Sequence, residues 1–261
     1  MDLSIIILNY NQKNLLKQCL RNIKEADLRL NYEIIVIDNA SVDGSVELIR
    51  EIQGQLSVAF KSILNKTNLG FTKGINQGIK AADGKYLLTL NPDVIVLSGS
   101  IEKIYQFMEE HPRVAVVGPK LFNPDKTVQF SCMRFPNLMT PVYRRTPLGK
   151  LPLAKKSLAK YLMKDFDHLK NREVDWLLGA CLIVRKEAIQ KVGLMDERYF
   201  LFFQDVDWCR RFWLAGWKVF YLAEAEMFHF HRRPSAKNFF DRLTRIHILD
   251  GLKYFWRWKF R

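Results

Sequence analysis

Three groups of side chains in this sequence could carry out chemistry: Asp93, the pair Asp205 and Asp207, and the histidines His229 and His231. Asp93 follows an apolar run and a proline, which cannot donate to a sheet ladder and so ends the strand. At a helix start, free backbone N–H groups and the helix dipole would stabilise the charged form of Asp205, as a general base requires. A divalent cation can bind one carboxylate, one imidazole and the oxygens of a diphosphate. Together these groups predict transfer from a nucleotide-activated donor.

Each group also has a simpler interpretation. An isolated Asp at a helix start is most often an N-cap, and a lone His is more often a surface or core residue than a ligand. Asp205 and Asp207 are two residues apart on a helix and cannot face the same point. If one is catalytic, we expect the other to be structural or to pair with Arg210 or Arg211.

The first half of the chain alternates between strands and helices, which is typical of a parallel sheet with right-handed crossovers. Strands are expected over residues 3–8, 33–37, 58–64 and 85–90. Parallel strands share one carboxyl edge, where α/β proteins usually bind ligands. Polar residues end all four strands at that edge: Asn9, Asp38, Asn65, and Asn91 with Asp93.

The glycines Gly70, Gly74 and Gly78 match neither the dinucleotide-binding fingerprint nor the P-loop. Two interpretations of their spacing stay open, close helix packing and backbone approach to a nucleotide.

The second half of the chain is less regular. We expect a helix over 98–110, a strand over 114–117 that ends at Gly118-Pro119, and a helix over 208–215 with Gly216 at its C-terminal end. Prolines at positions 136, 141, 147 and 152 predict a mobile or loosely ordered excursion.

The net charge of +14 predicts attraction to polyanions, which could be nucleic acid, an anionic membrane or phosphorylated ligands. Residues 144–164 hold seven Lys or Arg and no acid, and could be a solvated loop. Residues 237–261 alternate basic and aromatic side chains, which fits either packing on the core or contact with a bilayer.

The cellular location follows from the N-terminus, the apolar runs and the cysteines. The sequence shows neither a signal peptide nor an apolar run long enough to span a membrane. Its four cysteines are widely spaced, which fits a reducing cytosol better than zinc or disulfides. We therefore expect a cytoplasmic protein, at most peripheral on the inner face of the cell membrane.

In several segments, the chain resembles the inverting family 2 glycosyltransferases of GT-A fold, above all the bacterial rhamnosyltransferase-like members. The matching segments are residues 4–11, 36–45, 68–71, 90–94, 176–180 and 202–208, with His229 after them. The resemblance covers nearly the whole chain, and the order and spacing of the segments are specific to the family. One departure is Gln204, which stands where the family usually has Glu.

The resemblance implies an α/β, GT-A type nucleotide-diphospho-sugar transferase fold. A mainly parallel central sheet would be flanked by helices and followed by a C-terminal basic aromatic helical tail. The transferase domain would cover 1–235 and the helical extension 236–261. Within the domain, 1–120 would be the nucleotide-binding half, 136–170 a basic excursion and 171–235 the acceptor and catalytic half.

The resemblance also assigns roles to single residues. Asp205 would be the general base, and Asp93 with His229 would bind Mg²⁺ or Mn²⁺; His231 remains the alternative to His229. Trp176, Gly179 and Ala180 would lie where acceptor and donor sugar meet. The residues assigned to the nucleotide are Asn9, Tyr10, Asp38, Asn68, Gly70 and Asn91.

The leading hypothesis is a metal-dependent inverting glycosyltransferase that serves cell-envelope polysaccharide synthesis. Its donor would be a dTDP- or UDP-linked sugar and its acceptor a hydroxyl of a glycan or lipid-linked glycan. Peripheral membrane contact through the C-terminal tail would bring it to such an acceptor. Two alternatives are a basic nucleic-acid-binding protein, for which the sequence has no recognition motif and which we do not expect, and a catalytically inactive sugar-nucleotide binder.

Overall fold

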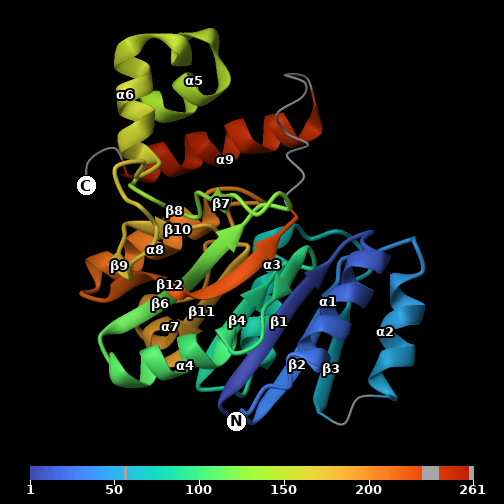
Figure 1. Cartoon of the computed structure of the whole chain (residues 1–261). Coiled ribbons are helices and arrows are strands. Elements are labelled where there is room, and N and C mark those ends of the chain that lie inside the picture. The colour runs from blue at the N-terminus through green and yellow to red at the C-terminus, as the bar shows by residue number, and fades with distance from the viewer. Residues whose placement is uncertain (56–57, 231–240, 259–261) are drawn as a thin grey trace.

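The computed structural model describes residues 1–55, 58–230 and 241–258. A central sheet lies between two sets of helices, and a further group of helices stands beyond one edge of the sheet (Figure 1). The strands are β1 Leu3–Asn9, β2 Tyr32–Asp38, β3 Ala59–Leu64, β4 Tyr86–Leu90, β5 Val94–Val96, β6 Val114–Phe122, β7 Val128–Gln129, β8 Cys132–Met133, β9 Arg172–Glu173, β10 Trp176–Leu177, β11 Cys181–Arg185 and β12 Lys218–His229. The helices are α1 Lys13–Glu25, α2 Ser45–Gln53, α3 Phe71–Ala81, α4 Ser100–Glu110, α5 Met139–Arg145, η1 (a 3₁₀ helix) Pro147–Lys150, α6 Pro152–Tyr161, α7 Lys186–Val192, α8 Gln204–Leu214 and α9 Arg242–Trp258.

The main sheet has the strand order β3-β2-β1-β4-β11-β6-β12-β5. β1 pairs in parallel with β2 and β4, and β6 pairs in parallel with β12. β11 runs antiparallel between β4 and β6. The expected α/β fold with a mainly parallel central sheet is therefore confirmed.

Side-chain alternation along the central strands builds a core on each face of the sheet. Ile5 and Ile7 of β1 join the core under α1, α2 and α4. Ile6, one residue out of phase, joins the opposite core with side chains of α3, α7 and α8. Because successive strand residues point to opposite faces, a continuous apolar run is what a strand covered on both sides requires.

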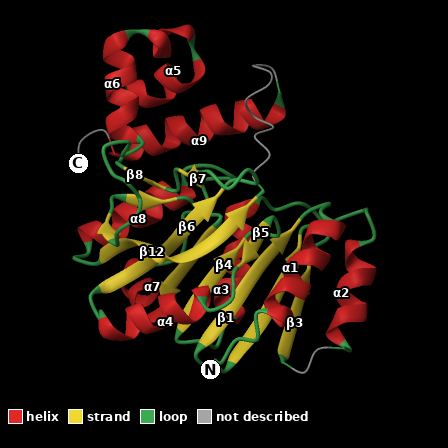
Figure 2. Ribbon diagram, in the orientation of Figure 1, coloured by secondary structure: helices red, strands yellow, loops and turns green. Residues whose placement is uncertain are grey.

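The register of the strands gathers their polar ends at one edge. Asn9 is paired with Asp38, and the N–H of Asn65 donates to the Asp38 carbonyl at 2.9 Å. At the far side of the sheet, His229 of β12 is paired with Val94, the residue after Asp93. The arrowheads of these strands point toward the side of the molecule that carries α5, α6 and α9 (Figure 2).

The glycines of α3 fit the packing interpretation at two positions. A Cβ on Gly74 would come within 2.5 Å of Leu8, and one on Gly78 within 2.4 Å of Ile6. These residues let α3 lie close against the sheet.

The segment 136–170 corrects our expectation of a loosely ordered excursion. It contains α5, η1 and α6, and two of its prolines begin η1 and α6 rather than disrupt them. Pro147 and Pro152 stand at the first turns of η1 and α6, where the missing N–H is not needed by the helix.

Two element boundaries also differ from the sequence prediction. β6 continues through Gly118-Pro119 to Phe122, because Pro119 lies beyond the stretch that pairs with β11 and before the stretch that pairs with β7. α8 begins at Gln204 instead of residue 208, which places Asp205 in its first turn; Gly216, with φ of 80°, follows its end as expected.

The C-terminal helix is present, as predicted. Tyr254 and Trp258 of α9 are buried in the same core as α8. Residues 237–240 and 259–261 of the basic aromatic run, and His231, lie outside the described residues. Within the described part of the chain, every helix is too short or too polar to cross a bilayer.

Candidate functional site

Asp205 lies buried in the first turn of α8. Its carboxylate accepts hydrogen bonds from the backbone N–H groups of Gly179, at 2.9 Å, and Val206, also at 2.9 Å. Burial raises the pKa of Asp205 to about 6, and these hydrogen bonds offset only part of the rise. The backbone N–H groups favour the charged form, as expected of a helix start, but desolvation outweighs them and keeps the pKa above that of an ordinary aspartate.

Gly179 and Ala180 join Asp205 to the end of β4. A Cβ on Gly179 would lie 3.3 Å from the Asp205 side chain, so the absence of a side chain allows the close approach. The next residue, Ala180, accepts the N–H of Asn91 at 2.9 Å. Two peptide units therefore connect the carboxylate with the Asn91-Pro92-Asp93 turn.

Asp93 and His229 come together across β5 and β12. The Nε2 atom of His229 lies 3.5 Å from Oδ1 of Asp93. This Oδ1 is buried and, among the described residues, accepts no hydrogen bond. Oδ1 and Nε2 are the oxygen and nitrogen ligands that Mg²⁺ or Mn²⁺ could use.

Gln129 of β7 orients the histidine ring. Nδ1 of His229 lies 2.7 Å from Oε1 of Gln129 and in the matching tautomer donates to it. That tautomer leaves Nε2, which lies 3.5 Å from Oδ1 of Asp93, without a proton, as a metal-ligating histidine requires. No motif in the sequence pointed to Gln129, which lies 100 residues from His229 along the chain.

Two protein ligands are too few to hold an ion tightly. Within residues 1–55, 58–230 and 241–258, no group of three or more His, Cys, Asp or Glu side chains could bind a metal. Asp93 and His229 therefore fit an ion that takes its other ligands from a bound diphosphate.

The residues expected at the nucleotide form two hydrogen-bonded clusters. In the first, Asn9 donates to Oδ2 of Asp38 and the N–H of Ser41 donates to Oδ1, both at 2.8 Å. Asn9 and Asp38 are fully buried, while the Tyr10 ring beside them is exposed. Ser41 was missed by sequence reasoning, although it lies only three residues from Asp38.

The second cluster holds the loop before α3. Asn68 accepts the N–H of Gly70 at 2.9 Å, and Asn39 donates to the Gly70 carbonyl at 3.0 Å. Gly70 has φ of 86°, and a Cβ there would lie 2.7 Å from the Phe200 ring. Gly70 thus needs to be glycine for its backbone conformation and for contact with Phe200. Asn39, which follows Asp38, was also missed.

Trp176 is buried in the core beside Tyr161, with ring centroids 6.4 Å apart. Its indole N–H donates to the Arg134 carbonyl at 2.8 Å. Little of the ring is left for a sugar, so direct contact of Trp176 with acceptor or donor stays a prediction.

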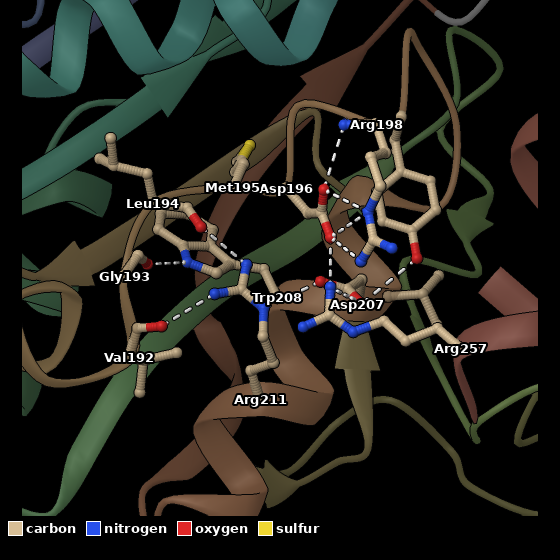
Figure 3. Close-up of polar contacts among 12 residues, drawn as sticks. Val192, Gly193, Leu194, Met195, Asp196, Arg198, Asp207, Trp208, Arg211 and Arg257 are labelled. Carbon is tan, nitrogen blue, oxygen red and sulfur yellow. Dashed lines mark hydrogen bonds and ion pairs between the residues drawn. The ribbon is translucent and has the colours of Figure 1, made fainter. Parts of the chain in front are cut away.

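Asp207 has the structural role expected of the second carboxylate. Arg211 binds it at 2.8 Å and also donates to the carbonyls of Val192 and Leu194 (Figure 3). Trp258 donates to Asp207 at 3.0 Å, and Arg257 lies 3.4 Å from it. Asp207 therefore fastens α9 to the helix that carries Asp205.

Asp250 of α9 is a further positioning residue that sequence reasoning missed. One oxygen of this buried carboxylate accepts the N–H groups of three consecutive residues, 200 to 202, at 3.0, 3.0 and 3.1 Å. The Phe200 carbonyl in turn accepts the N–H of Phe71, next to Gly70. Asp250 thus holds the segment that lies between Gly70 and Asp205.

Comparison with known proteins agrees with this arrangement. Residues 4–193 match the family described as Glycosyl transferase family 2. An N-acetylglucosaminyl-diphospho-decaprenol L-rhamnosyltransferase of Mycobacterium tuberculosis is 28% identical over 249 residues, which are 86% of this chain and 76% of the relative. The rhamnosyltransferase WbbL of Escherichia coli K12 is 24% identical over 255 residues, 96% of this chain and 91% of the relative.

Solved structures show the same fold at lower identity. GalNAc-T7 with UDP, GalNAc and Mn²⁺ has a TM-score of 0.67 and 14% identity. The match covers 89% of this chain and 44% of the GalNAc-T7 chain. The mannosyltransferase PcManGT of Pyrobaculum calidifontis, in complex with GDP-Man and Mn²⁺, has a TM-score of 0.63 and 16% identity. The match covers 90% of this chain and 58% of the mannosyltransferase chain. This chain therefore spans about half the length of these solved chains.

The sequence match covers most of the chain, and the fold is that of GT-A enzymes. This protein is a glycosyltransferase that belongs to glycosyltransferase family 2.

Proposed function

We propose that this enzyme transfers a sugar, with inversion, from a nucleoside diphosphate to a hydroxyl of a lipid-linked glycan. The observation that carries the proposal is the connection between Asp205 and the Asn91-Pro92-Asp93 turn through Gly179 and Ala180. It places a buried carboxylate within two peptide units of a candidate diphosphate site, as transfer from a nucleotide sugar requires.

Asp205 is the proposed general base. Its carboxylate takes the proton of the acceptor hydroxyl while the hydroxyl oxygen forms a bond to the anomeric carbon of the donor. The bond from that carbon to the diphosphate breaks, and the nucleoside diphosphate leaves with the electron pair. A pKa of about 6 keeps Asp205 mostly ionised at neutral pH and still basic enough to accept the proton.

Asp93 and His229 would hold Mg²⁺ or Mn²⁺, with Gln129 fixing the histidine ring. The ion would neutralise charge on the leaving diphosphate. The proposal that it binds mainly together with the nucleotide follows from the small number of protein ligands.

Asn9, Asp38 and Asn68 are proposed to shape the nucleotide pocket, with Gly70 beside them and Asn91 near the ribose. The exposed ring of Tyr10 offers a surface on which a base could stack. Gly179 and Ala180, which touch both Asp205 and Asn91, are proposed to lie where donor and acceptor sugars meet, with Trp176 behind them.

The names of both relatives support a deoxysugar donor, and the name of the mycobacterial one supports a prenol-linked acceptor. We propose dTDP-rhamnose as the first donor to test, with UDP-hexoses as the comparison. Such an acceptor places the reaction at the cytoplasmic face of a membrane, in cell-envelope polysaccharide synthesis. The exposed side chains of Leu249, Leu252 and Trp256 on α9 support peripheral contact of the tail with that membrane.

The test is transfer from each donor to a prenyl-diphosphate N-acetylglucosamine, measured with wild type and with Asp205→Asn. We expect the variant to lose roughly 10²–10⁴-fold in kcat while it still binds the donor. Val206, whose N–H binds Asp205 but whose side chain is in the core, provides a control as Val206→Ile. Near-normal turnover by Asp205→Asn would refute the base assignment.

A further inference from the structure

The turn between α5 and α6 exposes large apolar side chains. Leu148, Leu151 and Leu153 are 48%, 53% and 82% exposed. They lie within residues 147–156, which we call the leucine–lysine hairpin. Figure 1 shows that α5 and α6 meet at the part of the molecule farthest from the sheet. Three exposed leucines within six residues are a clustered apolar patch, which on a protein surface usually marks an interaction site.

The same hairpin is strongly basic. Lys150, Lys155 and Lys156 are exposed, and residues 135–164 contain seven Lys or Arg and no acid. In the part of the chain that the structure describes, the ion pairs include none of these three lysines. Their charge is therefore not balanced within the hairpin, and it is complementary to an anionic partner.

The hairpin is an ordered structure that presents these side chains outward. The N–H of Gly149 donates to the Thr146 carbonyl, and that of Leu151 to the Leu148 carbonyl, both at 3.1 Å. Gly149 approaches Tyr143 so closely that a Cβ would overlap its carbonyl oxygen. At the other end, Ala154 and Tyr161 of α6 are buried. Leucines held in the open by such a turn do not fold back onto their own domain.

We propose that the leucine–lysine hairpin docks this enzyme onto an anionic lipid bilayer. Leu148, Leu151 and Leu153 would enter the boundary between headgroups and acyl chains, and the lysines would contact anionic headgroups. Apolar anchors next to several cations are the combination that reversible bilayer binding needs, since either contribution alone is weak.

The position of the hairpin relates docking to catalysis, a step that rests on the proposed lipid-linked acceptor. The strand ends that carry Asn91 and the turn to Asp93 point toward the side of α5, α6 and α9 (Figure 2). A bilayer that touches the hairpin would therefore lie on the side of the molecule where Asp205 is found. An acceptor anchored in that bilayer would have its sugar directed at the site.

The sequence analysis assigned peripheral membrane contact to the C-terminal tail, and docking by the hairpin revises that assignment. Tyr254 and Trp258, two of the tail aromatics, are packed in the core and unavailable to lipid. Leu249, Leu252 and Trp256 remain exposed and could add to the contact. The basic segment 144–164, for which a solvated loop was one interpretation, holds the stronger membrane-binding element.

The decisive experiment is co-sedimentation of the full chain with vesicles of phosphatidylcholine, with and without phosphatidylglycerol. We expect the wild type to bind the anionic vesicles much more strongly. The double variant Leu151→Ser/Leu153→Ser should weaken binding at least roughly tenfold, because two apolar anchors are lost. Lys155→Gln/Lys156→Gln should weaken it by roughly 30-fold, given about 1 kcal/mol for each cation near an anionic surface.

Matched controls change the same residue types elsewhere. Leu214→Ser removes an exposed leucine at the end of α8, and Lys17→Gln/Lys24→Gln removes two exposed charges of α1. Both controls should bind vesicles as the wild type does. Equal binding by the wild type and the hairpin variants, or no binding by the wild type, would overturn the proposal. So would a wild-type dimer that the leucine variant converts to monomer, because the leucines would then cover a second copy.

Transfer assays separate this proposal from the proposed function. With dTDP-rhamnose, the hairpin variants should act normally on a water-soluble, short-prenyl acceptor and poorly on the same sugar carried by a long prenol in vesicles. Vesicle binding requires neither donor nor turnover. Hairpin-dependent binding without transfer from any donor would therefore count against the proposed reaction and leave membrane docking intact.

Discussion

Among single residues, Asp205 shows how burial adapts a carboxylate to its proposed task. The Gly179 and Val206 N–H groups favour the charged form, while the surrounding core disfavours it more strongly. A carboxyl with a pKa near 6 is a better proton acceptor than an ordinary aspartate and is still ionised at neutral pH.

The rate of transfer should follow this pKa. We expect kcat/KM to fall tenfold per pH unit below about 6, the pKa of Asp205, since the protonated base cannot accept the hydroxyl proton. Initial rates measured between pH 5 and 8 at saturating metal would show this fall in kcat/KM at acidic pH. A profile that stays flat down to pH 5 would contradict the role of Asp205.

The same pKa makes a prediction about stability. The folded state raises this pKa from 3.8 to about 6, so the contribution of the protonated group to stability is present below 3.8 and is lost as pH rises through 6. At pH 8, Asp205→Asn should therefore unfold at a higher temperature than the wild type, with a free energy of unfolding that is larger by at most about 3 kcal/mol. The difference should shrink toward pH 4, which thermal denaturation at both pH values can measure.

Gln129 would act on the proposed metal ion through His229. We expect Gln129→Ala to weaken Mn²⁺ binding roughly 10–100-fold in the presence of nucleoside diphosphate, because the imidazole loses its fixed tautomer. Electron paramagnetic resonance of free Mn²⁺ gives the affinity, and Gln106→Ala on α4 is the control. Stoichiometric metal kept by the wild type after dialysis without nucleotide would contradict a site of only two protein ligands.

Between elements, the main finding is that α9 holds the segment around the proposed donor site. Asp250 binds three consecutive backbone N–H groups, and Phe200 at the start of that run contacts both Gly70 and Phe71. A carboxylate with three N–H donors fixes a loop strongly, since hydrogen bonds to a charged group are stronger than neutral ones.

Replacement of Asp250 should therefore affect donor binding before it affects the fold. We expect Asp250→Asn to raise the KM for the donor roughly tenfold, with a smaller change in the KM for the acceptor. Asp250→Glu should restore part of the loss. Asp241→Asn, just before α9, is the control. Equal changes in both KM values, together with a large drop in melting temperature, would mean that Asp250 serves the fold alone.

For the whole molecule, α9 belongs to the core and is more than an appendage. Trp258 is buried and donates to Asp207, whereas Trp256, two residues earlier, is 73% exposed. We expect Trp258→Ala to lower the free energy of unfolding by roughly 3–5 kcal/mol and Trp256→Ala by much less. Chemical denaturation of the two variants compares them directly. Similar losses for the two variants would contradict the burial of Trp258 and the exposure of Trp256.

The sequence by itself determined the alternation of strands and helices in the first half of the chain and the sheet edge at which the polar strand ends gather. Continuous apolar runs such as residues 3–8 are typical of strands covered on both faces, and parallel strands end at a common edge. Spacing also separated the roles of Asp205 and Asp207, because residues two apart on a helix point in different directions.

Tertiary structure decided what depends on burial and on contacts between distant segments. Burial by distant segments raises the pKa of Asp205. Gln129 binds His229, and Asp250 binds residues 200–202, across long stretches of the chain. The prolines of 136–170 had predicted a mobile or loosely ordered excursion, yet two of them begin helices that expose leucines and lysines. Local sequence gives the type of each side chain, but only the packed chain decides which are desolvated, which are paired and which face outward.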